Sequence, residues 1–275
     1  AMLLGATVCL GQAQSPGDID LSFNPGVGAD SRVLALVRQA DGRLIVAGQF
    51  NSFNGMKHNR VTRLNADGSS DPTFNPGLGA DSTVNAVAVQ ADGRIILGGD
   101  FLGYDIYTSP RLVRLNPNGS MDATFGIGSG PNGSVQALAV QADGKILLAG
   151  SFTALNGVGR GRVARLNSDG SLDISFNPGT GANGTVLALA LQADGNIIAG
   201  GSFTFLGGGE SGTTERNHLG RLNADGIIGK TVRVSRTEAR VLLLTDPKCK
   251  ASALLQESRE TGVCSGTESV EPTLL

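Results

Sequence analysis

The sequence predicts an all-β fold whose main part is a β-propeller of four four-stranded blades, or an arc of a larger propeller. A block of 51 residues recurs four times, because Gln-Ala-Asp-Gly begins at Gln39, Gln90, Gln141 and Gln192. Two series of phenylalanines keep this spacing, at Phe50, Phe101, Phe152 and Phe203 and at Phe23, Phe74, Phe125 and Phe176. Glycine contributes 41 of the 275 residues, which suits a turn-rich β protein. A fixed period of this length indicates stacked supersecondary units.

The second repeat illustrates how each blade is expected to form. Asn75-Pro76-Gly77 has the chemistry of a type II turn, since glycine accepts a positive φ at low cost. Ala91-Asp92-Gly93 predicts a three-residue hairpin loop, and Asn118-Gly119 predicts a further turn. The four strands between these turns are expected at Val84–Gln90, Arg94–Phe101, Arg111–Asn116 and Met121–Phe125. Four short antiparallel strands per repeat are typical of a propeller blade.

The order of segments divides the chain into three parts. Residues 1–17 are apolar from Met2 to Leu10 and predict a leader or partial signal peptide, and with it an exported protein. Residues 18–226 hold the four repeats, and the strand expected at Asp18–Phe23 matches the outer strand of a repeat. We expect that strand to be able to complete the last blade and close the ring. The 51-residue period stops in residues 227–275, where short alternating and apolar runs predict further strands.

The repeat motifs resemble a known family. Asn-x-Asp-Gly-Ser-x-Asp-x-x-Phe-Asn-Pro-Gly and Gln-x-Asp-Gly-x-Ile-x-x-Gly-Gly-x-Phe, read from residues 65–77 and 90–101, are similar to the delta-60 repeat of bacterial β-propellers. The likeness covers about residues 18–226. It implies a propeller in an exported or surface-anchored bacterial protein, without a defined catalytic activity.

The segment after the repeats resembles a different family. The run Asp-Gly-Ile-Ile-Gly-Lys at residues 225–230 and the run Arg-Val-Leu-Leu-Leu-Thr-Asp-Pro at residues 240–247 look like the start of the β domain of the rod shape-determining protein MreC. This implies an incomplete, barrel-like β segment and, as partners, the cell-wall elongation proteins of the periplasm. Two origins are open: a genuine fusion, or a joining of two gene fragments at Asp225-Gly226.

Charge and composition exclude several classes of partner and site. The formal net charge of −2, without a basic field, argues against nucleic acid, and no segment predicts membrane insertion in the mature chain. The sequence contains 2 histidines at unrelated repeat positions and lacks a nucleophile motif or a phosphate loop, so no catalytic or cofactor-binding residue is expected. The scarcity of tyrosine and the absence of tryptophan argue against the alternative of a glycan-active enzyme.

Carboxylates at alternating positions offer a weak candidate metal site. The candidates are Asp67, Asp71, Asp169 and Asp173, with an oxygen-rich pattern like that of a calcium loop but without its distal glutamate. Asp-Gly at a hairpin explains the pattern without a metal. We therefore expect no metal at these residues and keep calcium as the alternative.

Two further series recur with the repeat. Asp30, Asp81, Asn132 and Asn183 precede the inner strands and would form a polar ring near one mouth of the central channel. Such a ring could hold a cation or water, which makes the four residues candidates for ligand binding. Asx residues also favour the turn needed there, and that structural role is the expectation. Arg63, Arg114, Arg165 and Arg221 are expected to brace strands through carbonyls or turn aspartates, with an anionic ligand as the alternative.

The loops between the second and third strands differ most from repeat to repeat. They lie at residues 51–59, 102–110, 153–161 and 204–217, and one of them contains both tyrosines, Tyr104 and Tyr107. Variable loops on a rigid scaffold are the usual place of binding, so the tyrosines are the candidate ligand contacts. The sequence thus predicts a non-enzymatic binding module whose partner is a protein or glycan at the cell surface. A cell-shape scaffold acting through the tail is the second hypothesis.

Overall fold

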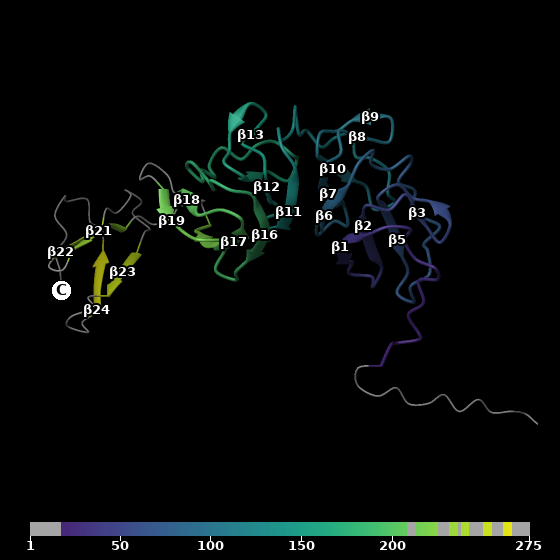
Figure 1. Cartoon of the computed structure of the whole chain (residues 1–275), viewed down its shortest axis with the longest axis horizontal. Helices are drawn as coiled ribbons and strands as arrows, with labels where there is room; N and C mark the ends of the chain where they lie inside the picture. Colours follow the sequence, from purple (N-terminus) through teal and green to yellow (C-terminus); the bar gives the residue numbers. More distant parts are fainter. Residues whose placement is uncertain are drawn as a thin grey trace, which may run out of the picture.

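The computed structural model describes residues 18–207 and 213–224, together with four strands of the tail at residues 231–235, 238–241, 250–254 and 261–265. The leader expected at residues 1–17 lies outside the described residues. All regular structure in the described part is β, as Figure 1 shows. No helix in that part has the length and apolar character needed to cross a membrane.

Each 51-residue repeat forms one blade with a three-stranded antiparallel sheet. The sheets of the first two blades are β1 (Val33–Arg38), β2 (Leu44–Gly48) and β5 (Val61–Leu64), then β6 (Val84–Val89), β7 (Ile95–Gly99) and β10 (Leu112–Leu115). Those of the last two are β11 (Val135–Val140), β12 (Ile146–Gly150) and β15 (Val163–Leu166), then β16 (Val186–Leu191), β17 (Ile197–Gly201) and β20 (Leu219–Leu222).

A small hairpin connects the second and third strands of every blade. The hairpins are β3 (Ser52–Phe53) with β4 (Met56–Lys57), β8 (Gly103–Tyr104) with β9 (Tyr107–Thr108), β13 (Ala154–Leu155) with β14 (Val158–Gly159), and β18 (Phe205–Gly207) with β19 (Thr213–Glu215). They lie along the outer rim of the molecule, whereas β1, β6, β11 and β16 lie toward its hub (Figure 1).

The expected fourth strand is the part of the blade that the structure corrects. The segment from Met121 to Phe125 makes a single bridge, Leu115 with Met121, in place of a ladder. Its backbone bonds locally instead: the Thr124 amide donates to Asp122 Oδ1 at 2.9 Å, and the Phe125 amide donates to the Asp122 carbonyl at 3.3 Å. Because the side chain of Asp122 captures the amide that a ladder would need, the segment turns and crosses to the next blade.

The tight turns form where their residues predict them. Gly42, Gly93, Gly144 and Gly195, which end the four Gln-Ala-Asp-Gly motifs, have φ between 82° and 88°. The amide of Gly93 donates to the Gln90 carbonyl at 2.9 Å, which closes the hairpin between β6 and β7. Glycine occupies this position because other residues would be strained at such a φ.

The hydrophobic core lies between the blades. One cluster joins Ile45 and Ala47 of the first blade to Ile95 and Leu97 of the second, and equivalent clusters join the second blade to the third and the third to the fourth. Six of the periodic phenylalanines belong to these clusters, namely Phe74, Phe101, Phe125, Phe152, Phe176 and Phe203. Phe50 belongs to a smaller cluster within the first blade, and Phe50, Phe101, Phe152 and Phe203 are completely buried. Each blade therefore depends on its neighbours for a large part of its apolar burial.

The four blades form an open arc. The inner strands pack side by side in the order β1, β6, β11 and β16, and no comparable packing joins β16 to β1 among the described residues. Figure 1 shows the first and last blades at opposite ends of a fan. The segment expected to close the ring stays on its own first blade, where the Asn24 amide donates to the Asp67 carbonyl at 2.8 Å.

The described strands of the tail form two antiparallel pairs. β21 (Thr231–Ser235) pairs with β22 (Glu238–Val241), and β23 (Lys250–Leu254) pairs with β24 (Thr261–Ser265). The remaining residues of the segment at 227–275 lie outside the described part of the chain.

Candidate functional site

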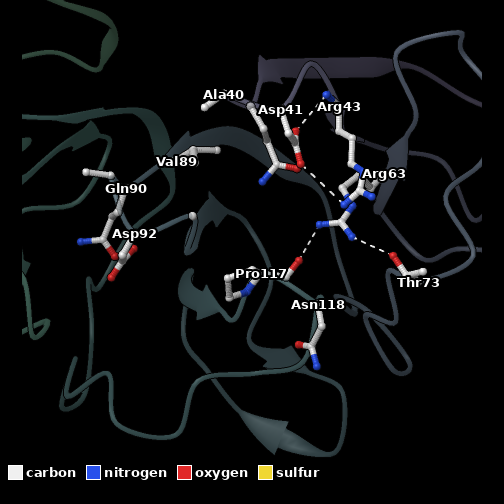
Figure 2. A pocket seen from close by; sticks show the side chains of 13 residues that line it. Ala40, Asp41, Arg43, Arg63, Thr73, Val89, Gln90, Asp92, Pro117 and Asn118 are labelled. Atoms are coloured by element: carbon white, nitrogen blue, oxygen red, sulfur yellow. Dashed lines mark hydrogen bonds and ion pairs between the residues drawn. The ribbon is translucent and has the colours of Figure 1, made fainter.

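A cleft of about 500 Å³ lies between the first two blades, beside their Gln-Ala-Asp-Gly turns. Arg43 and Arg63 line it from the first blade, and Asp92, Pro117 and Asn118 line it from the second (Figure 2). Gln39 also lines the cleft and is buried, yet its Oε1 accepts no hydrogen bond from the residues that the structure describes. The cleft therefore offers one unused acceptor beside two guanidinium groups.

Arg63 joins the two blades through every side of its guanidinium. Its Nε donates to Asp71 Oδ2 at 2.7 Å, its Nη2 donates to Thr73 Oγ1 at 3.2 Å, and its Nη1 donates to the Pro117 carbonyl of the next blade. The guanidinium carbon lies 4.9 Å from the centre of the Phe74 ring. Figure 2 shows the contacts to Thr73 and Pro117. With all these positions occupied, Arg63 is a structural brace of the cleft.

The same arrangement, which we call the Arg–Asp clamp, recurs at the next two blade interfaces. Arg114 Nε donates to Asp122 Oδ2 at 2.8 Å, and Arg165 Nε donates to Asp173 Oδ2 at 2.7 Å. Both arginines also donate to a carbonyl of the following blade and stack on the phenylalanine that follows the aspartate. The expectation that the recurrent arginines brace strands is confirmed for these three blades. Arg221, in the last blade, is exposed.

The clamps also determine the ionisation of the aspartates. Burial opposes ionisation of Asp71, but hydrogen bonds from Thr73 and Arg63 outweigh it and hold its pKa below the ordinary value. The balance is the same for Asp122, with Thr124 and Arg114, and for Asp173, where hydrogen bonds from Ser175, Lys145 and Arg165 lower the pKa. These carboxylates are therefore ionised and already paired with cations at neutral pH.

The calcium candidates occupy two kinds of place. Asp71 and Asp173 are the clamp aspartates. Asp67 and Asp169 are exposed in turns, where each Oδ1 accepts from the amide and the hydroxyl of the serine two residues later, Ser69 or Ser171. In the described part of the chain, no group of three or more His, Cys, Asp or Glu side chains lies close enough to hold a metal ion.

The polar series Asp30, Asp81, Asn132 and Asn183 anchors the start of the rim hairpins. Asp30 Oδ1 accepts from the Asn51 amide at 2.8 Å, and Asp81 Oδ1 accepts from the Leu102 amide at 3.0 Å. Asn132 Oδ1 accepts from the amides of Thr153 and Ala154, and Asn183 Oδ1 accepts from those of Thr204 and Phe205. These side chains therefore use one oxygen to position a variable loop.

The two tyrosines, both candidate ligand contacts, lie in very different surroundings, and Tyr104 is too deeply buried to contact a ligand at the surface. Tyr104 is 0% exposed within the cluster between the first two blades, because its repeat position is an apolar one that holds Phe53, Leu155 or Leu206 in the other blades. Its hydroxyl has no hydrogen-bond partner among the described residues, and burial raises its pKa. Tyr107 is 54% exposed on β9.

Tyr107 belongs to a row of exposed apolar side chains that the sequence analysis missed. Met56, Tyr107 and Val158 share one repeat position on β4, β9 and β14, and all three are exposed. Ile106, beside Tyr107, is also exposed. The signal was present in the sequence, because the three residues are 51 positions apart. We call Met56, Tyr107 and Val158 the rim row.

Comparisons with solved structures find proteins of low sequence identity. A gluconolactonase from Xanthomonas campestris is 15% identical over 84% of this chain and 68% of its own, with a TM-score of 0.43. The extracellular domain of a protein described as a hybrid two-component system of B. thetaiotaomicron is 13% identical over 84% of this chain and 26% of its own, with a TM-score of 0.41. PorZ, a surface component of the type-IX secretion system of Porphyromonas gingivalis, is 14% identical over 87% and 37%, with a TM-score of 0.31. No curated protein matches the chain.

Family models match both parts of the sequence. Residues 216–275 match the model described as rod shape-determining protein MreC, barrel core. A β-propeller model matches four segments of the chain, one for each blade, and together they make up more than half of the chain. The segments are residues 39–74, 90–125, 141–176 and 192–226. The protein with the clamped blades therefore belongs to the family described as domain of unknown function (DUF5122) beta-propeller.

Proposed function

We propose that the blade arc is a non-enzymatic binding module of an exported bacterial protein and that the rim row is its contact surface. The observation that carries this proposal is the recurrence of exposed apolar side chains at Met56, Tyr107 and Val158. Each lies on a two-stranded hairpin, so ordered backbone presents one of these side chains in each of the first three blades. Exposed apolar groups in a repeated array favour contact with another macromolecule.

The anchoring of the hairpins supports the same role. Asp30, Asp81 and Asn132 bond the backbone at the start of the three hairpins that carry the rim row. A surface that is ordered before binding loses less conformational entropy when the partner arrives. Because the row contains aliphatic side chains and one tyrosine, a protein surface fits it better than a polar glycan does.

A peptide library tests this proposal. Random 12-residue peptides displayed on phage are selected against the immobilised full chain, and the affinities of selected peptides are measured by fluorescence anisotropy. The substitution of Tyr107→Ser should weaken binding about tenfold or more, and the triple variant Met56→Ser, Tyr107→Ser, Val158→Ser should abolish it. Ile174→Ser, which removes an exposed apolar side chain away from the hairpins, is the matched control and should bind normally. Peptides that bind the triple variant as well as the parent chain would contradict the proposal.

A second candidate function rests on the match of residues 216–275 to the MreC barrel core. We propose that this segment acts as a cell-shape scaffold if it associates with the cell-wall elongation proteins. The chain would be expressed in rod-shaped bacteria depleted of their own MreC. Restored rod shape would support this function, and cells that stay round while the chain accumulates would contradict it.

A further inference from the structure

The two ends of the arc expose residues that are buried at every internal blade interface. Leu219, in the last blade, is 63% exposed, whereas its equivalents Val61, Leu112 and Val163 are all 0% exposed. Val33, in the first blade, is 41% exposed, whereas its equivalents Val84, Val135 and Val186 are all 0% exposed. We call the end with Val33 and Phe23 the leading face and the end with Ile198, Leu219 and Arg221 the trailing face.

The contacts at an internal blade interface indicate which side chain would pack on each end face. Val135, on the inner strand of the third blade, packs directly on Gly98 of the second, since a Cβ built on Gly98 would lie 2.5 Å from Val135 Cγ1. At the trailing face, Gly200 has the position of Gly98 and is only half-buried. At the leading face, Val33 has the position of Val135. No valine packs on Gly200 within the arc, and the equivalent valine, Val33, is exposed at the other end.

The leading face carries the aspartate half of a clamp. Ser22 donates from its amide and its hydroxyl to Asp20 Oδ1, at 2.9 Å and 2.6 Å, as Thr124 donates to Asp122 at 2.9 Å and 2.7 Å. Phe23 follows Asp20 as Phe125 follows Asp122 in the second repeat, but Phe23 is more exposed than its equivalents. No cation pairs with Asp20 among the described residues, so its Oδ2 is available for an arginine.

The trailing face carries the arginine half. Arg221 occupies the position of Arg63, Arg114 and Arg165, which are almost fully buried, and it is exposed. The sequence that follows Arg221 has Gly229 and Val232 where the other repeats have the clamp aspartate and phenylalanine. Asp194 lies near enough to Arg221 for the arginine to help lower its pKa, but no equivalent of the clamp aspartate or phenylalanine is among the described residues of the trailing face.

We infer that the trailing face of one chain binds the leading face of a second copy, with Arg221 of the first paired to Asp20 and stacked on Phe23 of the second. The contact repeats the geometry of the three internal interfaces, in which an apolar cluster surrounds an Arg–Asp clamp. Two such contacts close two arcs into one ring with a twofold axis. A second copy fits better than the chain's own first segment, because that segment is held on the first blade at Asp67 and lies at the far end of the fan (Figure 1).

Charge reversal tests the contact in the full chain. Sedimentation velocity at about 1 to 100 μM should give a particle of twice the 28.0 kDa chain mass. Arg221→Glu, and separately Asp20→Arg, should weaken the association by about 30-fold or more, since each leaves like charges opposed in a desolvated contact. The double variant Arg221→Glu, Asp20→Arg should restore the dimer. Lys57→Glu, an equal charge change on the rim hairpin of the first blade, is the matched control and should leave the dimer intact.

Each result supports or overturns this inference. A dimer lost in both single variants and recovered in the double variant supports it. A particle of single-chain mass over the whole concentration range overturns it, as does a dimer that Arg221→Glu leaves unchanged. Longer particles would overturn the closure at two copies. A lower melting temperature for Arg221→Glu with single-chain mass throughout would show that the chain closes on itself and would equally overturn it.

Discussion

Removal of the central clamp arginine, Arg114→Ala, is expected to destabilise the blade arc by about 3 kcal/mol. The guanidinium is 5% exposed, lies 2.8 Å from Asp122 Oδ2 and 4.5 Å from the centre of the Phe125 ring, and donates to the Ser168 carbonyl of the next blade. Loss of one partner from a buried ion pair costs about 3 to 5 kcal/mol, because the other charge stays buried.

The lower end of that range applies because Asp122 keeps a second cation. Arg94 Nε lies 3.3 Å from Asp122 Oδ2, but its side chain is 39% exposed, so solvent weakens the remaining attraction. A loss of about 3 kcal/mol is a large part of the 5 to 15 kcal/mol typical of a folded domain. For a unit of this size it corresponds to a fall of about 6 to 12 °C in melting temperature.

Equilibrium unfolding in urea measures this loss. Arg114→Lys should recover only a small part of the stability, since an ammonium group does not reproduce the three-sided contact of the guanidinium. Lys57→Ala, which removes an exposed cation, should change the free energy of unfolding by less than about 0.5 kcal/mol. A loss below about 1 kcal/mol for Arg114→Ala, or a full recovery with lysine, would refute the reasoning that the clamps hold the blades together.

Three further predictions follow from the described contacts. Tyr104→Phe should raise the free energy of unfolding by about 1 kcal/mol, because it removes a buried hydroxyl that has no partner in the described part of the chain; a decrease in the urea midpoint would show that the hydroxyl is satisfied. Gly150→Ala should lower the melting temperature strongly in differential scanning calorimetry, since its Cβ would lie 1.9 Å from the Ser134 carbonyl oxygen. Gly159→Ala in the same blade is the control and should be nearly neutral, because its Cβ would meet nothing within 4 Å. Equal effects of the two substitutions would contradict the close packing of β11 on β12. The pKa values of Asp71, Asp122 and Asp173 are lowered in the folded state, so the unfolded chain binds more protons in acid, and the stabilisation from these groups should persist above about pH 5 and be lost as the pH falls below about 4. Asp122→Asn should make the urea midpoint less sensitive to pH between about 4 and 2, and an unchanged pH dependence would count against the depressed pKa.

Local chemistry repeated every 51 residues made most of the fold predictable. The turn at Ala91-Gly93, the strands on either side of it and the bracing role of Arg63 depend on residues that act over short distances or recur in each blade. The fourth strand at Met121–Phe125 was predicted wrongly because it was inferred from the turn at Asn118-Gly119 that precedes it. In the structure the Asp122 side chain captures the Thr124 amide and turns the chain.

The features that depend on position in the assembled arc were less predictable. The burial of Tyr104 follows from its repeat position, which Phe53 and Leu155 share, so alignment of the repeats contained the signal. The cleft at Gln39 arises where two blades meet, and no single repeat contains both of its walls. The open arc depends on the angle between blades, which many small packing contacts determine together.

Hydrogen–deuterium exchange of the full chain tests the central claim, that four equivalent blades form by the same contacts in each 51-residue repeat. The middle strands β2, β7, β12 and β17 pair on both sides, so their amides should exchange most slowly, in four bands at the repeat spacing. The amides of the rim hairpins should exchange much faster between these bands. Slow exchange confined to one repeat, or protection without this spacing, would contradict the account.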